Sequence, residues 1–190
     1  MIELYAFACG VRELPEECDA VELGAVTAVV GDVHGDAMRH GLIVQALVDT
    51  ADAVLPARFG ERFDDAAALA ASVAPRLREL ERRLAAVDGC VELAVRVGRP
   101  ERPRAEDGGA YMRARLREAN AASALHALLQ ERARATVVTE SPLLHDACYL
   151  VDRCAVDDFA RTLAAYGDAH PELNLVCTGP WAPASFAEAA

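Results

Sequence analysis

The sequence predicts an α+β protein of two small domains, each a ferredoxin-like or modified ferredoxin-like sheet with helices on one face. Short segments of branched and aromatic residues alternate with stretches whose apolar residues recur every three or four positions. The connections between these segments are brief. One charged, proline-containing stretch then divides the chain. We therefore expect an N-terminal domain over residues 1–98, a linker over residues 99–109 and a C-terminal domain over residues 110–190.

Two strands and a helix are expected at the start of the chain. Residues 2–9 are rich in aromatic and branched side chains, and residues 21–33 contain an apolar run from Ala25 to Val30. From Asp36 to Ala51 the apolar residues take up the spacing of a helix with one apolar face. The domain thus begins with strand, strand and helix.

A hinge, defined as residues 54–60 (Val-Leu-Pro-Ala-Arg-Phe-Gly), separates this helix from the next one. Val54 and Leu55 form a short apolar strand, Pro56 lacks a backbone donor, and Gly60 allows the chain to turn. The hinge therefore separates two amphipathic segments.

A longer helical segment and the most regular strand complete the N-terminal domain. Apolar residues recur at helical spacing over residues 69–87, where Pro75 should kink or restart the helix. Apolar and polar residues then alternate over residues 91–97, as in a half-buried strand.

The second domain repeats the mixture of helices and short strands. Residues 110–134 form a long Ala-, Arg-, Glu- and Leu-rich helix, and another helical face extends from Val156 to Ala164. Strands are expected over residues 136–139, 147–151 and 173–177. A Gly-Pro turn and a tail with the single tryptophan, Trp181, should follow the last strand.

Composition excludes several classes of protein. The 190 residues are 53% hydrophobic and 26% charged, which is ordinary for a folded chain. Nineteen basic residues, all arginine, stand against 30 acidic ones, and the net charge of -11 argues against nucleic acid as a partner. No apolar run approaches the roughly 18 residues of a membrane span. We expect a cytoplasmic protein that binds neither nucleic acid nor membrane.

One motif suggests an enzyme. Gly31-Asp32-Val33-His34-Gly35-Asp36 follows a strand-like segment and is similar to the first metal-binding motif of metallophosphoesterases. The further motifs that would complete a two-metal centre do not occur in the chain. We therefore expect no catalytic, cofactor or metal site, with Asp36 serving as a helix cap.

An ordered set of motifs resembles the GvpF/GvpL family of gas vesicle proteins. The hinge is similar to the family's Leu-Pro-x-Arg-Phe-Gly segment, and the C-terminal Thr-Gly-Pro-Trp is similar to its ending, although Ala182 and Ala184 depart from that pattern. Other matches follow family order: Tyr5-Ala6-Phe7, residues 23–30, His40, residues 89–97, Tyr111, Tyr149-Leu150-Val151 and Phe159. The resemblance covers nearly the whole chain.

The resemblance implies an accessory gas vesicle protein without enzymatic activity. Such a protein would bind the small hydrophobic shell protein GvpA and other accessory proteins, prevent shell-protein aggregation, and be found in the cytoplasm or at the gas vesicle. The family-motif residues, with structural or interaction roles, are Leu55, Pro56, Arg58, Phe59, Gly60, Thr178, Gly179, Pro180 and Trp181. The strand near residues 91–97, as a sheet edge, and the helix over residues 110–134 are the surfaces proposed for shell-protein binding.

Two alternatives stay open on the sequence. The strand and helix pattern also fits a generic ferredoxin-like oligomerisation or regulatory module. A metal-dependent phosphoesterase rests on Asp32 and His34 alone.

Overall fold

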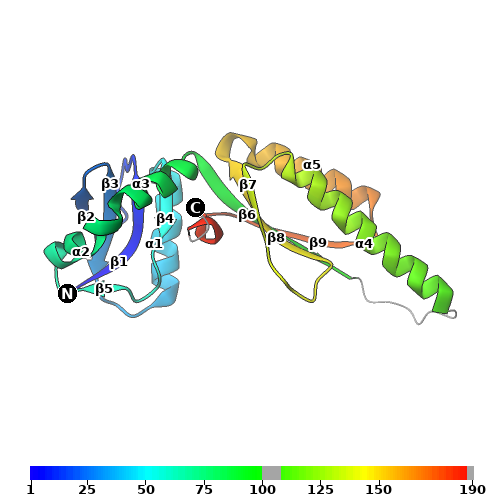
Figure 1. Ribbon diagram of the computed structural model, residues 1–190, viewed down its shortest axis with the longest axis horizontal. Coiled ribbons are helices and arrows are strands. Elements are labelled where there is room, and N and C mark those ends of the chain that lie inside the picture. Colours follow the sequence, from blue (N-terminus) through cyan, green and yellow to red (C-terminus); the bar gives the residue numbers. More distant parts are fainter. Residues whose placement is uncertain (100–107, 188–190) are drawn as a thin grey trace. The chain divides into compact units, whose positions relative to one another are not determined.

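The structure, a computed structural model, describes residues 1–99 and 108–187 and divides into two compact units (Figure 1). Unit 1 consists of Met1–Val91 and the C-terminal segment from Trp181 onward, and unit 2 consists of Glu92–Pro180. Each unit combines helices with an antiparallel sheet. The predicted α+β fold class is confirmed.

The sheet of unit 1 is built around its first strand. The strand order is β2-β3-β1-β4, and the short β5 also pairs with β1. The strands are β1 (Ile2–Cys9), β2 (Cys18–Leu23), β3 (Val26–Asp32), β4 (Ala53–Pro56) and β5 (Arg62–Phe63). The helices are α1 (Ala37–Thr50), α2 (Ala66–Val73) and α3 (Leu77–Ala86), with a 3-10 turn, η1 (Ala74–Arg76), between the last two.

A β-bulge in β1 decides which side chains share a face. The pairing of β1 with β3 shifts register between Leu4 and Ala6, and the extra residue changes the alternation of side chains along the strand. Every residue from Glu3 to Ala8 is buried. Because neighbouring residues of a strand point to opposite faces, both faces of β1 are covered.

Some element boundaries in unit 1 differ from those predicted. Residues 21–33 form parts of the β2–β3 hairpin and not one strand, because Gly24, with φ +73°, turns the chain between them. The two-residue β5 was not predicted. Pro75 lies in η1, so the predicted restart of the helix is confirmed.

Unit 2 has the βαββαβ order of a ferredoxin-like fold. Its elements are β6 (Cys90–Gly98), α4 (Gly108–Gln130), β7 (Ala135–Val138), β8 (His145–Asp152), α5 (Val156–Ala169) and β9 (Asn174–Trp181), with strand order β7-β8-β6-β9. Both helices lie on one face of the sheet (Figure 1). Leu125 and Leu129 of α4 and Phe159 of α5 pack there on Leu93, Val95 and Tyr149 of the sheet.

The compact units differ from the predicted domains at two places. The strand over residues 91–97 is β6, which lies inside the second sheet and not at an edge, because β8 and β9 flank it. The strand β9 continues through Gly179-Pro180, where we predicted a turn, and the segment after it belongs to unit 1. Most of the predicted linker, residues 100–107, lies outside the described residues.

Candidate functional site

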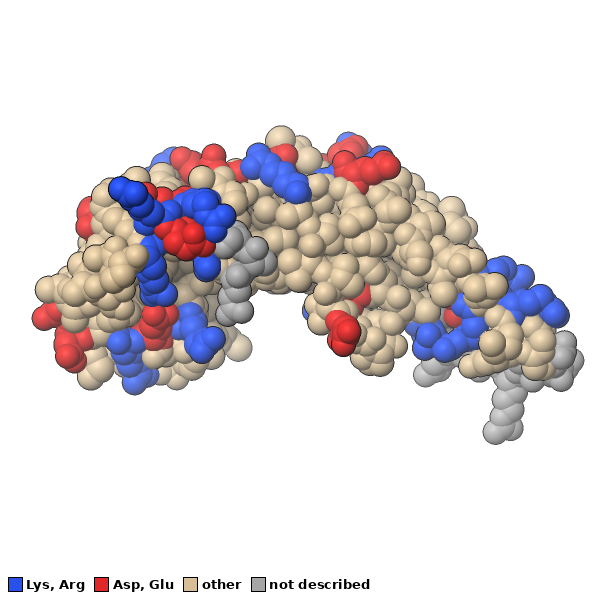
Figure 2. Space-filling view, viewed as in Figure 1, with Lys and Arg blue, Asp and Glu red and all other residues tan. Residues whose placement is uncertain are grey.

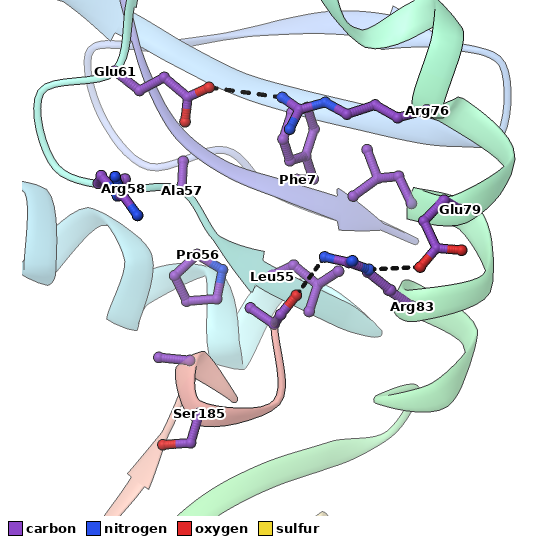
Figure 3. Close-up of a pocket in the computed structure, with 13 residues that line it drawn as sticks. Phe7, Leu55, Pro56, Ala57, Arg58, Glu61, Arg76, Glu79, Arg83 and Ser185 are labelled. Carbon is purple, nitrogen blue, oxygen red and sulfur yellow. Dashed lines mark hydrogen bonds and ion pairs between the residues drawn. The ribbon is translucent and has the colours of Figure 1, made fainter. Parts of the chain in front are cut away.

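A cleft of about 510 Å³ lies in unit 1 beside the hinge (Figure 3). Residues from β1, β4, the hinge, α3 and the C-terminal segment line it. We call it the hinge cleft, and its lining residues are Phe7, Leu55, Pro56, Ala57, Arg58, Glu61, Arg76, Glu79, Leu80, Arg83, Ala184, Ser185 and Ala187.

The floor of the hinge cleft is apolar. Phe7 of β1 and Leu55 of β4 are register partners, so their side chains lie on the same face of the sheet. Leu80 of α3 lines the cleft beside them. All three are buried side chains of the core. The β1 bulge contributes to this arrangement, because it helps to set the face on which Phe7 lies.

Charged side chains of both signs form the rim. Arg76 Nη2 lies 3.7 Å from Glu61 Oε1, and Arg83 Nε lies 2.9 Å from Glu79 Oε1. Hydrogen bonds from Arg82 and then Arg83 lower the pKa of Glu79, so its carboxylate is ionised at neutral pH. Three arginines and two glutamates line the cleft, which leaves one excess positive charge in a chain whose net charge is -11.

Arg83 also holds the C-terminal segment in the cleft. Its Nη1 donates a hydrogen bond of 2.7 Å to the main-chain carbonyl of Ala187 (Figure 3). Phe186, in the 3-10 turn η3 (Ala184–Phe186), is buried, so the segment is anchored by an aromatic side chain as well. A main-chain carbonyl of the chain's own C-terminal segment is thus bound at the cleft by a guanidinium donor.

The hinge is fixed to β1 through its main chain. Ala57 N donates a hydrogen bond to Tyr5 O, and Leu4 N donates one to Glu61 O; the donor–acceptor distance is 2.9 Å in each. The five residues from Ala57 to Glu61 form the loop between β4 and β5, which both pair with β1. Gly60 adopts φ +80°, a conformation that favours glycine, near the end of this loop.

A buried histidine supports the hinge from α1. His40 Nε2 donates a hydrogen bond of 3.2 Å to Ala57 O, and its ring meets Phe59 edge to face at 5.6 Å. On its other side, His40 Nδ1 lies 3.7 Å from Glu3 Oε1, and Arg62 Nε lies 3.9 Å from Glu3 Oε2. Glu3 is only 2% exposed. The buried side chains of Glu3 and His40 therefore connect the hinge to β1 and α1.

The predicted site residues separate into two groups. Leu55, Pro56 and Arg58 line the hinge cleft, and Phe59 and Gly60 continue the same loop. Thr178, Gly179 and Pro180 lie on β9 in unit 2, and Trp181, 47% exposed, ends that strand. The C-terminal residues that line the cleft are instead Ala184, Ser185 and Ala187.

Several cleft residues were not predicted from the sequence. Arg76 and Arg83 lie in a charged segment, which by itself indicates a solvated face. On α3, Glu79 precedes Arg82 and Arg83 by three and four residues, a spacing that signals ion pairs but does not reveal the cleft. Glu3 did carry a signal: it is a charged residue inside an apolar strand.

The lining chemistry suits peptide binding. Among the described residues, those that line the cleft include no histidine or cysteine. Apolar side chains and guanidinium groups instead match a partner with apolar side chains, main-chain carbonyls or carboxylates. Charges of both signs are interspersed over unit 1 on the face seen in Figure 2.

The segment similar to a metallophosphoesterase motif caps a helix. Asp36 is the N-cap of α1, and its side chain accepts hydrogen bonds from Met38 N and Arg39 N. The predicted cap is confirmed. Within residues 1–99 and 108–187, no three His, Cys, Asp or Glu side chains are grouped so that they could hold a metal ion. Over the same residues, no helix has both the length and the apolar character to cross a membrane.

Comparisons with known proteins agree on one family. A family model described as gas vesicle synthesis protein GvpL/GvpF matches residues 7–108 and 109–188. Gas vesicle protein F2 of Halobacterium salinarum is 28% identical over 178 residues, which cover 88% of this chain and 79% of that protein. These matches extend over nearly the whole chain.

Two crystal structures share the fold. GvpF from Microcystis aeruginosa superposes with a TM-score of 0.78 at 13% identity and covers 98% of both chains. GvpF from Anabaena sp. PCC7120 gives a TM-score of 0.74 at 14% identity, covering 98% of this chain and 95% of that one. The resemblance noted from the motifs is confirmed: the chain belongs to the GvpL/GvpF family of gas vesicle synthesis proteins.

Proposed function

We propose that this protein is an accessory factor of gas vesicle assembly, which binds the shell protein GvpA through the hinge cleft and keeps it from aggregating. It acts by binding and not by catalysis, in the cytoplasm and at the growing vesicle, together with other accessory proteins. The observation that carries the proposal is the family match along the chain, which includes the hinge that forms one wall of the cleft.

The chemistry of the cleft supports this role. A subunit that lines a gas-filled wall must expose apolar surface before it assembles, and Phe7, Leu55 and Leu80 offer a matching apolar floor. The arginines on the rim can bind carboxylates or main-chain carbonyls at the border of that surface. Binding of this kind is reversible, as release to a growing shell requires.

Co-expression with tagged GvpA tests the proposal. The soluble fraction of GvpA and its co-purification with this chain are measured for the wild type and for Arg58→Glu, which reverses a charge on the rim. We expect the wild type to keep GvpA soluble. We expect Arg58→Glu to lower co-purification on the order of tenfold. The variant replaces a hydrogen-bond donor with a carboxylate, which repels the carboxylates that the arginine would bind.

Arg161→Glu is the matched control. Arg161 lies on α5 of unit 2, is 73% exposed and pairs with Asp158, so this variant makes the same change of charge outside the cleft. It should retain GvpA as the wild type does. Equal aggregation of GvpA with and without the chain would refute the solubilising role, and equal losses in both variants would refute the cleft as its site.

A further inference from the structure

Two half-buried histidines and a buried tyrosine form a hydrogen-bonded cluster in unit 2. His126 Nδ1 lies 2.8 Å from Tyr149 Oη, and His145 Nε2 lies 2.9 Å from the same oxygen. The two imidazole rings are 4.6 Å apart between centroids. His126 is on α4, whereas Tyr149 and His145 are on β8, so the cluster joins the long helix to the sheet.

The hydroxyl group limits how many protons the cluster can hold. Tyr149 has one O–H donor, so one ring nitrogen can accept it while the other must carry a hydrogen and donate to the oxygen. A first added proton leaves this arrangement intact. A second proton makes both ring nitrogens donors, deprives the tyrosine hydrogen of its acceptor and places two positive charges side by side.

The tyrosine at the centre of the cluster is shielded from water, whereas the two imidazoles are partly exposed. Tyr149 has no exposed surface, and Phe159 of α5 packs on its ring at 5.4 Å. Burial lowers the pKa of His126, and burial together with His126 lowers the pKa of His145, opposed by the nearby Asp146. Both imidazoles are therefore neutral at pH 7.

Neighbouring elements bring few charges to the cluster. Asp146 is engaged by Arg96 of β6, whose Nε lies 3.5 Å from its carboxylate. Asp158 of α5 lies 3.8 Å from Arg132, just beyond α4. On β7, the register partner of Tyr149 is the uncharged Thr136.

We propose that the His126–Tyr149–His145 cluster is a proton-sensitive latch that holds α4 on the sheet of unit 2 and releases it on acidification. The cluster lies within the part of α4 that packs on the sheet, because the buried residues of the helix, including Ala122, Leu125 and Leu129, flank His126 in sequence. The latch is independent of the hinge cleft, which lies in unit 1.

The pH range over which the latch opens follows from the direction of the pKa shifts of His126 and His145. A histidine whose pKa is lower in the folded than in the unfolded protein stabilises the fold fully above its unfolded pKa, near 6.5. That stability is lost as the pH falls from about 6.5 toward the lowered folded values. We expect α4 to loosen over this interval and not in the neutral range.

Hydrogen exchange of the full chain, followed by mass spectrometry and corrected for the intrinsic pH effect, tests the latch. In the wild type, α4 amides should become more exchangeable by up to about tenfold per pH unit for each proton taken up below pH 6.5. A variant with His126→Asn and His145→Gln keeps donors and acceptors near the positions of Nδ1 and Nε2 but does not titrate. Its α4 protection should lose this pH dependence.

His34→Gln provides the control. His34 is an exposed histidine of unit 1, just before α1. This variant should keep the wild-type pH dependence of α4. The same pH dependence of α4 in the double variant as in the wild type would overturn the proposal.

Titration of the unmodified protein tests the latch without any substitution. Histidine proton resonances followed by NMR should give midpoints below 6.5 for two of the five histidines, and these two should lose their signals in the double variant. Midpoints at or above 6.5 for His126 and His145 would refute the proposal even if the double variant failed to fold.

Discussion

Single buried polar residues fix the position of the hinge. His40 contacts the hinge through a main-chain carbonyl and the ring of Phe59, and it faces the buried Glu3 on its other side. Glu3 Oε2 and His40 Nδ1 have no hydrogen-bond partner in the described chain. The electrostatic contacts among Glu3, His40 and Arg62 therefore stabilise these buried atoms. Loss of any member leaves a buried polar group with less compensation.

The substitution His40→Ala is therefore expected to destabilise the protein. It removes the donor to Ala57 O and leaves Glu3 with Arg62 alone, which should lower the free energy of unfolding by about 2 kcal/mol or more. Urea-induced unfolding followed by circular dichroism measures the change. His34→Ala, at an exposed position just before the same helix, should stay within about 0.5 kcal/mol of the wild type. Equal stability of both variants would show that the buried contact contributes nothing.

At the scale of elements, the C-terminal segment completes the hinge cleft from far along the chain. The hydrogen bond from Arg83 to Ala187 joins residues 104 positions apart, and Phe186 is 5% exposed in the core of unit 1. Burial of one aromatic side chain is the main apolar anchor of this segment, because the neighbouring residues are small.

Removal of that anchor should weaken unit 1. Phe186→Ala is expected to cost about 3 kcal/mol, the usual range for a buried phenylalanine, and to reduce the hydrogen-exchange protection of β1 more than that of β8. Phe59→Ala, at a side chain 45% exposed, should cost less. A loss of protection confined to β8 would contradict the placement of the segment in unit 1.

Local sequence patterns predicted most helices and strands, but they did not predict the contacts between segments that are distant in the sequence. Helical spacing identified α1 and α4, and Pro75 marked the break before α3, because these signals act within a few residues. The central position of β6 depends on pairing with β8 and β9, about 50 and 80 residues later, and alternation of side chains carries no strand order. The β2–β3 hairpin was missed because the strand-like residues on the two sides of Gly24 resemble one continuous strand.

The candidate site was predicted in part for the same reason. The Leu-Pro-x-Arg-Phe-Gly segment is contiguous, so Leu55, Pro56 and Arg58 could be identified from the sequence. The cleft itself exists only where the hinge, α3 and the C-terminal segment meet. Arg83 could not be assigned to the cleft from the sequence, because its contact with Ala187 leaves no local signal.

At the scale of the whole molecule, the chain carries two independent features on two units. Unit 1 contains the hinge cleft, with the family motif and the terminal segment, and unit 2 is a complete ferredoxin-like fold with the histidine latch. A chain that crosses from unit 1 to unit 2 at Glu92 and returns at Trp181 makes unit 2 an insertion between two parts of unit 1. The two proposals can therefore be tested separately.

The most direct test of the central claim is a gene replacement in the organism that encodes this protein, with gas vesicles counted by electron microscopy. Deletion should abolish or sharply reduce vesicles. The wild-type gene and Arg161→Glu should restore them, whereas Arg58→Glu should not, with all variants present at equal protein levels. Normal vesicles in the deletion strain would contradict the assembly role, and full restoration by Arg58→Glu would contradict the hinge cleft as the site of action.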